Sequence, residues 1–531
     1  MSLLALSSLS QRQSRSNTRI LLWSVCTTLL IYLLQADKGY NLADEGFLWY
    51  GVQRVLAGEV PIRDFMSYDP GRYYWSAAIM ALTGNESLLA LRAASALFQA
   101  IGLFIALKLV FFRTEKPGHL LLLPAAVLLS VWMYPWFKTF DIVSSIAIAF
   151  GITLLIDKPS YRQYFVLGTV IGLAAIFGRN HGVYGVAASL GAMLFLAIRG
   201  EKGQHPIRCA VAWGAGICTG FLPILAMAAV VPGFAAALRQ SIVFLLLEQK
   251  ETNISLPVPW PWLVKIDVLP PWDAAAAVLL GILFIAIVAF GILGLTWSFI
   301  QRARGKAVSP VLVTCSLLAL PYAHYAFSRA DAVHLAQGIF PLLIGVLAIA
   351  THRSALVSVP LAAVLCSASL VAMLPVHAGW QCYAMLQCQP IELGGNRIAV
   401  DPRTASDLAM LNKLADAYAP NHQEILVMPF WPGAYSALNR KSPPWEIYAL
   451  FPRTRQFELA EIERIKAANP GFALVIDAAL DDREELRFRN THPLTYQYIV
   501  ENFEPVSGYT QEQAYRIYKR KDAGISPRIK P

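Results

Sequence analysis

Two stretches decide the fold of this chain, Ala43-Asp-Glu-Gly-Phe-Leu-Trp-Tyr50 and Ser67-Tyr-Asp-Pro-Gly-Arg-Tyr-Tyr-Trp75. They form one polar loop that directly follows a first apolar segment. The rest of the first 375 residues consists of apolar segments joined by short connectors. Carboxylates at a membrane boundary are costly unless they are solvated, paired or used. The acidic pair in this loop, Asp44 and Glu45, therefore indicates a functional site at a membrane surface.

The composition is that of a polytopic membrane protein. Of the 531 residues, 56% are hydrophobic and 15% are charged, whereas soluble domains carry about 25% charged residues. Several apolar runs reach the roughly 20 residues that cross a bilayer. We predict an all-α membrane bundle of about eleven spans. Their expected positions are 20–36, 86–112, 119–134, 138–156, 163–179, 182–198, 209–231, 274–299, 308–327, 335–350 and 356–374.

The basic residues predict the orientation of the bundle. One set of short connectors carries nearly all of the loop cations and almost no acids, which is typical of cytoplasmic loops. This set contains Arg12, Arg15, Arg19, Arg113, Lys116, Lys158, Arg162, Arg199, Lys202, Arg208, Arg302, Arg304, Lys306 and Arg353. The amino terminus is then cytoplasmic, on an uncleaved first helix, and everything after residue 375 is external. The net charge of +10 reflects this asymmetry and does not indicate a nucleic-acid partner.

The chain divides into three parts. Residues 1–375 form the membrane body, 376–400 a connector, and 401–531 an external domain with frequent charges and short apolar runs. The pattern in the last part predicts helices at 403–419, 458–469 and 493–502 and strands at 424–429, 472–477 and 513–519. Such alternation favours a small α/β domain.

An unusual external connector spans residues 232–273. Residues 233–248 predict an amphipathic helix, and the segment 256–262 is rich in proline and tryptophan. Two interpretations stay open, a rim over a lipid-binding cleft and a simple interfacial anchor.

Two cysteines, Cys382 and Cys388, lie outside the membrane in this topology, with five residues between them. In an oxidising compartment this spacing predicts a disulfide, and the alternative is two unpaired thiols. The sequence contains no paired-cysteine or histidine-rich metal pattern, so we expect no metal and no cofactor.

The polar loop supplies candidate catalytic residues. Adjacent side chains point in different directions, so one of Asp44 and Glu45 could act as a base while the other orients it or binds substrate. Alternatively, Asp44 only caps a helix at 45–57. Tyr68, Asp69 and Arg72 are candidate substrate-binding residues, because carboxylates interleaved with aromatic rings commonly hold a sugar. Interfacial aromatic residues also occur as ordinary belt residues.

A second polar cluster, Arg329, Asp331 and His334, follows the ninth span. If Asp331 begins a helix, Asp331 and His334 share a face, and Arg329 can bind an anionic headgroup. The alternative is an Arg–Asp pair that only closes the loop. Arg179 and His181 could add to the same anion-binding rim, although a histidine at a helix end is more often structural. All these residues are expected at the external face, where a lipid phosphate would enter sideways between helices.

The arrangement resembles the GT-C glycosyltransferases, which take sugar from polyprenyl-phosphate donors. The resemblance rests on Asp44-Glu45, Gly58-Glu-Val-Pro61 and Tyr68-Asp-Pro-Gly-Arg-Tyr-Tyr-Trp75, and the 329–334 stretch is similar to a late-loop motif of these enzymes. The bacterial branch related to protein mannosyltransferases and lipid A aminoarabinose transferases usually has a Pro-Pro element before the aromatic pair. This chain has Asp69-Pro-Gly71 there.

The resemblance implies an inverting transfer of a hexosyl or pentosyl group to a glycan, lipid or protein acceptor. Asp44 would take the proton from the acceptor hydroxyl, and Arg329 and His334 would stabilise the leaving phosphate. It also implies a bacterial inner membrane, with the carboxyl-terminal domain in the periplasm and no metal requirement. The rival classes are a lipid-linked saccharide transporter or flippase, an O-antigen ligase or polymerase, and a receptor whose external domain is the functional part.

Overall fold

The computed structural model describes residues 3–114, 119–199, 205–249, 253–385 and 387–521. Some of the predicted features lie outside these ranges. They are the basic residues Lys116 and Lys202, position 386 of the connector 376–400, positions 250–252 of the external connector 232–273, and the end of the external domain 401–531. Contacts divide the chain into two compact units. Unit 1 comprises Met1–Ala36, Arg92–Pro232 and Thr252–Trp380, and unit 2 comprises Asp37–Leu91, Gly233–Glu251 and Gln381–Pro531.

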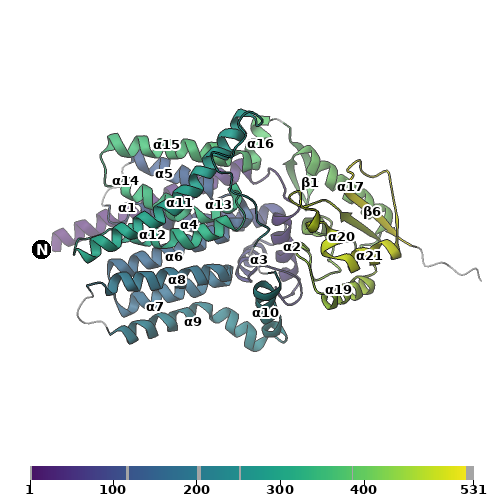
Figure 1. Cartoon of the computed structure of the whole chain (residues 1–531), viewed down its shortest axis with the longest axis horizontal. Helices are drawn as coiled ribbons and strands as arrows, with labels where there is room; N and C mark the ends of the chain where they lie inside the picture. The colour runs from purple at the N-terminus through teal and green to yellow at the C-terminus, as the bar shows by residue number, and fades with distance from the viewer. Residues whose placement is uncertain (1–2, 115–118, 200–204, 250–252, 386, 522–531) are drawn as a thin grey trace, which may run out of the picture. The chain divides into compact units, whose positions relative to one another are not determined.

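Unit 1 is helical and contains the long apolar helices (Figure 1). Its helices are α1 (Leu3–Gln35), α4 (Leu88–Val110, whose first turn belongs to unit 2), α5 (His119–Trp132), η1 (Trp136–Lys138), α6 (Thr139–Asp157), α7 (Tyr161–Phe177), α8 (Arg179–Ala197), α9 (Pro206–Val230), α11 (Pro271–Ala303), α12 (Pro310–Phe327), α13 (Ala332–Gly338), α14 (Phe340–Ala350), α15 (Ala355–Met373), η3 (Leu374–Val376) and α16 (Ala378–Met385, which belongs to unit 2 from Gln381 on). In Figure 1, α7, α8 and α9 run side by side.

Among the described residues, eight helices are long and apolar enough to cross a membrane. The pair α13 and α14 would form a ninth span, bent by 56°. The bend falls where Pro341, in the first turn of α14, cannot donate a backbone hydrogen bond to the preceding turn. Each predicted span coincides with one of these helices or with the shorter apolar helices Leu121–Trp132 and Tyr161–Phe177. The chain is therefore a multi-pass membrane protein, as predicted.

Unit 2 combines helices with two small sheets. Its helices are α2 (Asp44–Leu56), α3 (Gly71–Thr83), α10 (Phe234–Val243), η2 (Phe244–Gln249), α17 (Pro402–Tyr418), α18 (Pro432–Ala437), α19 (Arg455–Ala468), η4 (Glu484–Leu486), α20 (Phe488–Thr491) and α21 (Pro493–Asn502). Its strands are β1 (Gln389–Leu393), β2 (Asn396–Val400), β3 (Leu426–Met428), β4 (Phe472–Ile476), β5 (Phe503–Pro505) and β6 (Tyr515–Arg520).

The larger sheet has the order β3-β4-β6-β5. Strands β3 and β4 are parallel, and β6 is antiparallel to both β4 and β5. Side chains from β3, β4 and helix α19 meet in its core, among them Leu426, Val475 and Ile465. All three predicted strands and all three predicted helices of the carboxyl-terminal part are present within a few residues, so the predicted small α/β domain is confirmed.

The predicted connector contains secondary structure. Strands β1 and β2 pair antiparallel and are joined by the two-residue turn Gly394-Gly395. Both glycines have positive φ, 55° and 74°, which two-residue hairpin turns require and which other residues rarely adopt.

The observed division of the chain also differs from the predicted boundary at residue 375. The polar loop, residues 37–91, belongs to the same unit as the carboxyl-terminal domain. The reason is that its aromatic side chains are buried within unit 2. Tyr50, 1% exposed, packs against Phe65 and Tyr435 with ring-centroid distances of 6.1 and 5.8 Å. A local sequence pattern does not reveal which distant segment packs against these aromatic side chains.

Candidate functional site

Helix α2 begins at Asp44, and Asn41 caps it. The Asn41 side-chain oxygen accepts hydrogen bonds from the backbone N–H groups of Ala43, at 2.9 Å, and Asp44, at 2.8 Å. The residue directly before the helix, Ala43, has no capping side chain. The alternative that Asp44 serves as the helix cap is therefore wrong, because Asn41 satisfies the first backbone donors.

Asp44 and Glu45 differ in accessibility. Asp44 is partly exposed, whereas Glu45 is only 4% exposed and its Oε2 accepts from the backbone N–H of Asn41 at 3.5 Å. The Tyr448 hydroxyl donates to Asp44 Oδ1 at 3.4 Å. Of the two carboxylates, Asp44 is thus the one accessible to a ligand, and it accepts a hydrogen bond from a hydroxyl group.

Around this carboxylate, unit 2 gathers an aromatic cluster that includes two other predicted residues. The Phe47 ring lies 4.9 Å from that of Tyr68 and 5.5 Å from that of Tyr448. The guanidinium of Arg72, 4% exposed, lies 4.6 Å from the Tyr68 ring centroid. Asp69, 9% exposed, precedes the helix that carries Arg72. The contact between the Arg72 cation and the Tyr68 ring stabilises this cluster, and Tyr68, 37% exposed, is the more accessible of the two side chains.

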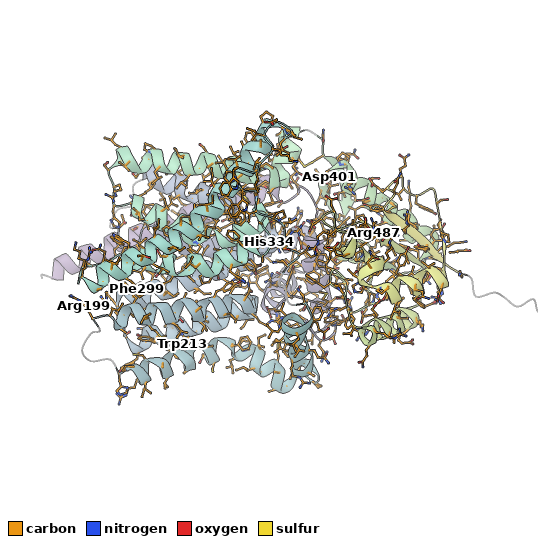
Figure 2. The ribbon with its side chains drawn as sticks, in the orientation of Figure 1. Arg199, Trp213, Phe299, His334, Asp401 and Arg487 are labelled. Carbon is orange, nitrogen blue, oxygen red and sulfur yellow. A yellow bond between two sulfur atoms is a disulfide. The ribbon has the colours of Figure 1, made fainter. Side chains whose placement is uncertain are left out.

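In unit 1, the predicted residues Arg329, Asp331 and His334 are in direct contact. Asp331 caps α13, and its Oδ1 accepts from both the backbone N–H and the Nδ1 of His334, each at 2.8 Å. Arg329 Nε donates to Asp331 Oδ2 at 3.1 Å, and its Nη1 donates to the Ile254 carbonyl at 3.0 Å. The side chain of His334 is labelled in Figure 2. The Arg–Asp pair thus does close the loop, but it also orients a histidine.

The pKa of the Asp331 carboxyl is held below its usual value. Burial raises this pKa, but the hydrogen bonds and charge of His334, together with the charge of Arg329, outweigh that effect. An ionised Asp331 can only accept, so Nδ1 of His334 carries the proton. Within the described part of the chain, the other ring nitrogen, Nε2, has no hydrogen-bond partner, so it is available to a ligand.

The remaining predicted residues, Arg179 and His181, lie at the start of α8. His181 is fully buried, with Nδ1 2.9 Å from the Tyr322 hydroxyl and Nε2 3.0 Å from Asp141 Oδ1. Both ring nitrogens are engaged, which supports the structural interpretation of His181 over a substrate contact. Arg179 is partly exposed.

Sequence reasoning missed Tyr448 and Asn41. Tyr448 lies 404 positions from Asp44 along the chain, in a segment without a recognisable motif, so no local signal could identify it. Asn41 could have been identified, since asparagine shortly before an acidic helix start is a common capping residue. The structure joins the predicted cysteine pair, Cys382 and Cys388, by a disulfide with a Cα–Cα distance of 5.0 Å.

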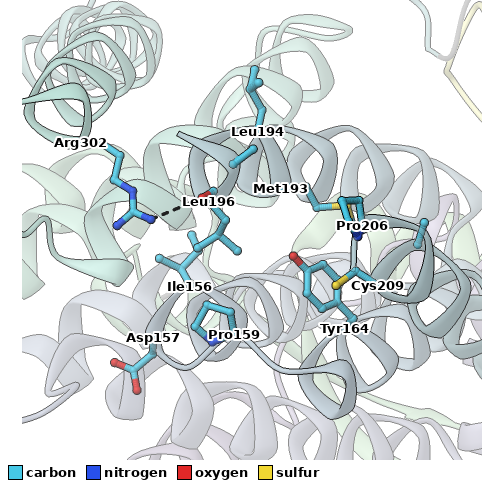
Figure 3. A pocket seen from close by; sticks show the side chains of 12 residues that line it. Ile156, Asp157, Pro159, Tyr164, Met193, Leu194, Leu196, Pro206, Cys209 and Arg302 are labelled. Atoms are coloured by element: carbon cyan, nitrogen blue, oxygen red, sulfur yellow. Dashed lines mark hydrogen bonds between the residues drawn. The ribbon is translucent and has the colours of Figure 1, made fainter. Parts of the chain in front are cut away.

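A cavity of about 710 Å³ lies elsewhere in unit 1 (Figure 3). It lies between the end of α6, the end of α8 and the start of α9, and its wall includes Asp157, Tyr164, Cys209 and Arg302. Arg302 hydrogen-bonds to the carbonyl of Leu196 there (Figure 3). None of the predicted site residues lines this cavity, so we do not assign the chemistry to it. Among the described residues, no group of three or more His, Cys, Asp or Glu could hold a metal ion.

No protein-family model matches the sequence, and no curated protein is significantly similar to it. The structure, in contrast, is similar to ArnT from Cupriavidus metallidurans. In the apo state, ArnT aligns with a TM-score of 0.53 at 12% identity, over 94% of this chain and 98% of ArnT. Bound to undecaprenyl phosphate, ArnT aligns with a TM-score of 0.50 at the same identity and coverage. Over 94% of its length the chain therefore has the fold of ArnT, in agreement with the fold that the resemblance to GT-C enzymes implied.

Proposed function

We propose that this protein is an integral-membrane glycosyltransferase that moves a sugar from a polyprenyl-phosphate donor to an acceptor at the external membrane face. The observation that carries the proposal is the GT-C fold over almost the entire length of both this chain and ArnT, a protein whose complex contains undecaprenyl phosphate. The accessible carboxylate of Asp44 at the start of α2 supplies the chemistry that such a transfer needs.

In the proposed reaction, Asp44 acts as the general base. Its carboxylate takes the proton from the acceptor hydroxyl while the acceptor oxygen attacks the anomeric carbon from the side opposite the phosphate. The bond between the anomeric carbon and the phosphate oxygen breaks, and the polyprenyl phosphate leaves with the bonding electrons. One displacement of this kind inverts the anomeric configuration.

Arg329 and His334 are proposed to stabilise the leaving phosphate. Guanidinium geometry matches phosphate oxygens, and a protonated His334 Nε2 could donate a further hydrogen bond. The contacts of Asp331 support a different role from the predicted substrate binding. Its carboxylate bonds to His334 and Arg329, so it orients them and reduces their mutual repulsion. In unit 2, Tyr68, Asp69 and Arg72 are proposed to bind the sugar or the acceptor.

We further propose that the protein lies in a bacterial inner membrane with its amino terminus in the cytoplasm. The basic connectors support this orientation, which makes the carboxyl-terminal domain periplasmic. The acceptor is then a glycan, lipid or protein on that side. The phosphate leaving group would be stabilised by cationic side chains, and we propose no metal requirement.

Two rival functions make different predictions for the same lipid. A flippase would move a lipid-linked saccharide intact, and an O-antigen ligase or polymerase would transfer a whole glycan. The accessible Asp44 beside an aromatic cluster supports bond-making chemistry, whereas a flippase has no need of a general base.

Purified protein in lipid nanodiscs should be incubated with undecaprenyl-phosphate-linked hexoses and pentoses and with candidate acceptors. The proposal predicts release of undecaprenyl phosphate, detected by mass spectrometry, and an acceptor that gains one sugar of inverted configuration. An intact donor across all sugars and acceptors would contradict it. In the same assay, Arg329→Ala should weaken donor binding, by about 1.5–3 kcal/mol for each lost charged hydrogen bond. Arg304→Ala, which changes an exposed arginine of a basic connector, is the matched control.

A further inference from the structure

The α/β domain has a place where ligands commonly bind, and its own chain occupies that place. In open α/β sheets, ligands bind outside the carboxyl ends of parallel strands. Strands β3 and β4 are the parallel pair, and α18 follows the carboxyl end of β3. The residues of α18 contact the segment that leads into α2. Helix α18, which follows β3, therefore packs against helix α2, the helix that begins with Asp44 and Glu45.

Gly433 makes the central contact. Its backbone N–H donates to the Leu42 carbonyl at 2.8 Å, and its carbonyl accepts from the Tyr40 hydroxyl at 3.0 Å. Helices α2 and α18 approach so closely that a Cβ atom on Gly46 would lie 2.3 Å from the Gly433 Cα. A contact this short is a steric clash, so the close approach of the two helices requires a glycine at position 46.

Further bonds hold the rest of the loop to the same domain. The Tyr50 hydroxyl accepts from the backbone N–H of Ser442 at 3.0 Å. The Trp445 side chain donates from Nε1 to the Ile62 carbonyl at 3.1 Å. The backbone carbonyl of Trp445 accepts from the backbone N–H of Met66 at 2.9 Å. The loop is thus fixed to the domain before α2, along α2 and after it.

We propose that the carboxyl-terminal domain is part of the catalytic unit and that Tyr448 is a positioning residue for the Asp44 carboxylate. The Tyr448 hydroxyl donates to Asp44 Oδ1 at 3.4 Å, and its ring packs against Phe47 one helical turn further along α2. A donor on one carboxylate oxygen limits rotation of the group and leaves the other oxygen for the acceptor proton. This inference rests on the proposed role of Asp44 as base.

The first test is Tyr448→Phe, which removes the hydroxyl and keeps the ring. Because the bond is long, we expect kcat to fall about tenfold, with donor KM within about twofold of wild type. In an Asp44→Asn background the same change should have almost no further effect, since Tyr448 acts through the carboxylate. Tyr509→Phe is the matched control, because it removes a hydroxyl that donates at 3.2 Å to Tyr418 in the same domain.

Additive losses in the double variant would overturn the positioning role, as would an unchanged kcat in Tyr448→Phe. Both results require an active wild-type protein whose activity depends on Asp44. The proposed function can therefore hold while this inference fails.

The second test needs no activity. Gly433→Ala places a Cβ atom 2.4 Å from the Tyr40 hydroxyl and 2.7 Å from the Leu42 carbonyl. Hydrogen exchange of peptides that cover residues 40–50 should therefore become faster in the full-length variant. Gly214→Ala, where a Cβ atom meets nothing within 4 Å, should leave it unchanged. Unchanged hydrogen exchange in Gly433→Ala would refute the idea that the carboxyl-terminal domain holds helix α2 in place.

Discussion

Replacing Asp44 by Asn tests the proposed base while changing the structure little. Asn has the same shape as Asp and can still accept the hydrogen bond from Tyr448, but it cannot take a proton from an acceptor. The capping bonds of α2 come from Asn41 and stay in place. The change therefore isolates the chemical role of the carboxylate.

The expected magnitudes separate rate from stability. Loss of a general base should lower the transfer rate by roughly 10²–10⁴-fold. The free energy of unfolding should fall by only about 0.3–1 kcal/mol, the usual contribution of an acidic residue at a helix amino terminus. Asn41→Ala should do the opposite, with a loss of about 0.5–2 kcal/mol of stability as for other capping residues.

The assay measures release of undecaprenyl phosphate under single-turnover conditions, together with donor binding and thermal unfolding in the same nanodiscs. Donor affinity should be nearly unchanged in Asp44→Asn, since in the proposed reaction the carboxylate contacts the acceptor and not the phosphate. Glu45→Gln serves as a comparison, because Glu45 is buried and bonded to the backbone of Asn41.

Near-normal turnover in Asp44→Asn would refute the base assignment, and Glu45 or Asp69 would become the candidate. A large loss of both turnover and stability would show that the side chain is structural. Only a slow, stable protein that still binds donor agrees with the reasoning.

Three further predictions concern topology, the disulfide and pH. A reporter fused after Gly305 should be cytoplasmic and one fused after the last residue external; finding both on one side would reject the predicted orientation. Cys382 and Cys388 should resist thiol labelling until a reductant is added, and their loss should weaken the region locally, at the low end of about 2–4 kcal/mol, because the closed loop is short. Burial raises the pKa of the Asp407 carboxyl to about 6, so its favourable contribution to stability is present at low pH and is lost as the pH rises through 6. Asp407→Asn, which can still accept from Tyr515, should raise the unfolding temperature at pH 8 but not at pH 4, and equal shifts at both values would contradict this.

Features that depend on local sequence were predictable. Apolar runs predicted the membrane helices, since a bilayer demands about 20 apolar residues per span. Strand β4 and helix α21 were predicted almost to the residue because their hydrophobic pattern and flanking prolines or glycines are local signals. The acidic pair and the 329–334 cluster were identifiable because charged residues next to apolar helices are costly unless they are solvated, paired or functional.

Other features depend on how distant segments meet, and only the tertiary structure decided them. The sequence left His181 open between an anion ligand and a structural residue, and its contacts with Asp141 and Tyr322 support the second. The assignment of residues 37–91 to the unit of the carboxyl-terminal domain likewise had no local signal.

By itself, then, the sequence determined the membrane topology class, the secondary structure and the polar stretches that carry candidate chemistry. Only the tertiary structure decided that the Asp44 carboxylate meets Tyr448 and that Asp331 orients His334. The physical reason is that helix and strand formation follows the spacing of apolar residues over a few turns, and membrane insertion follows the length of a continuous apolar run. A contact across hundreds of residues depends instead on the path of the chain and on shape complementarity between buried faces, which no short pattern encodes.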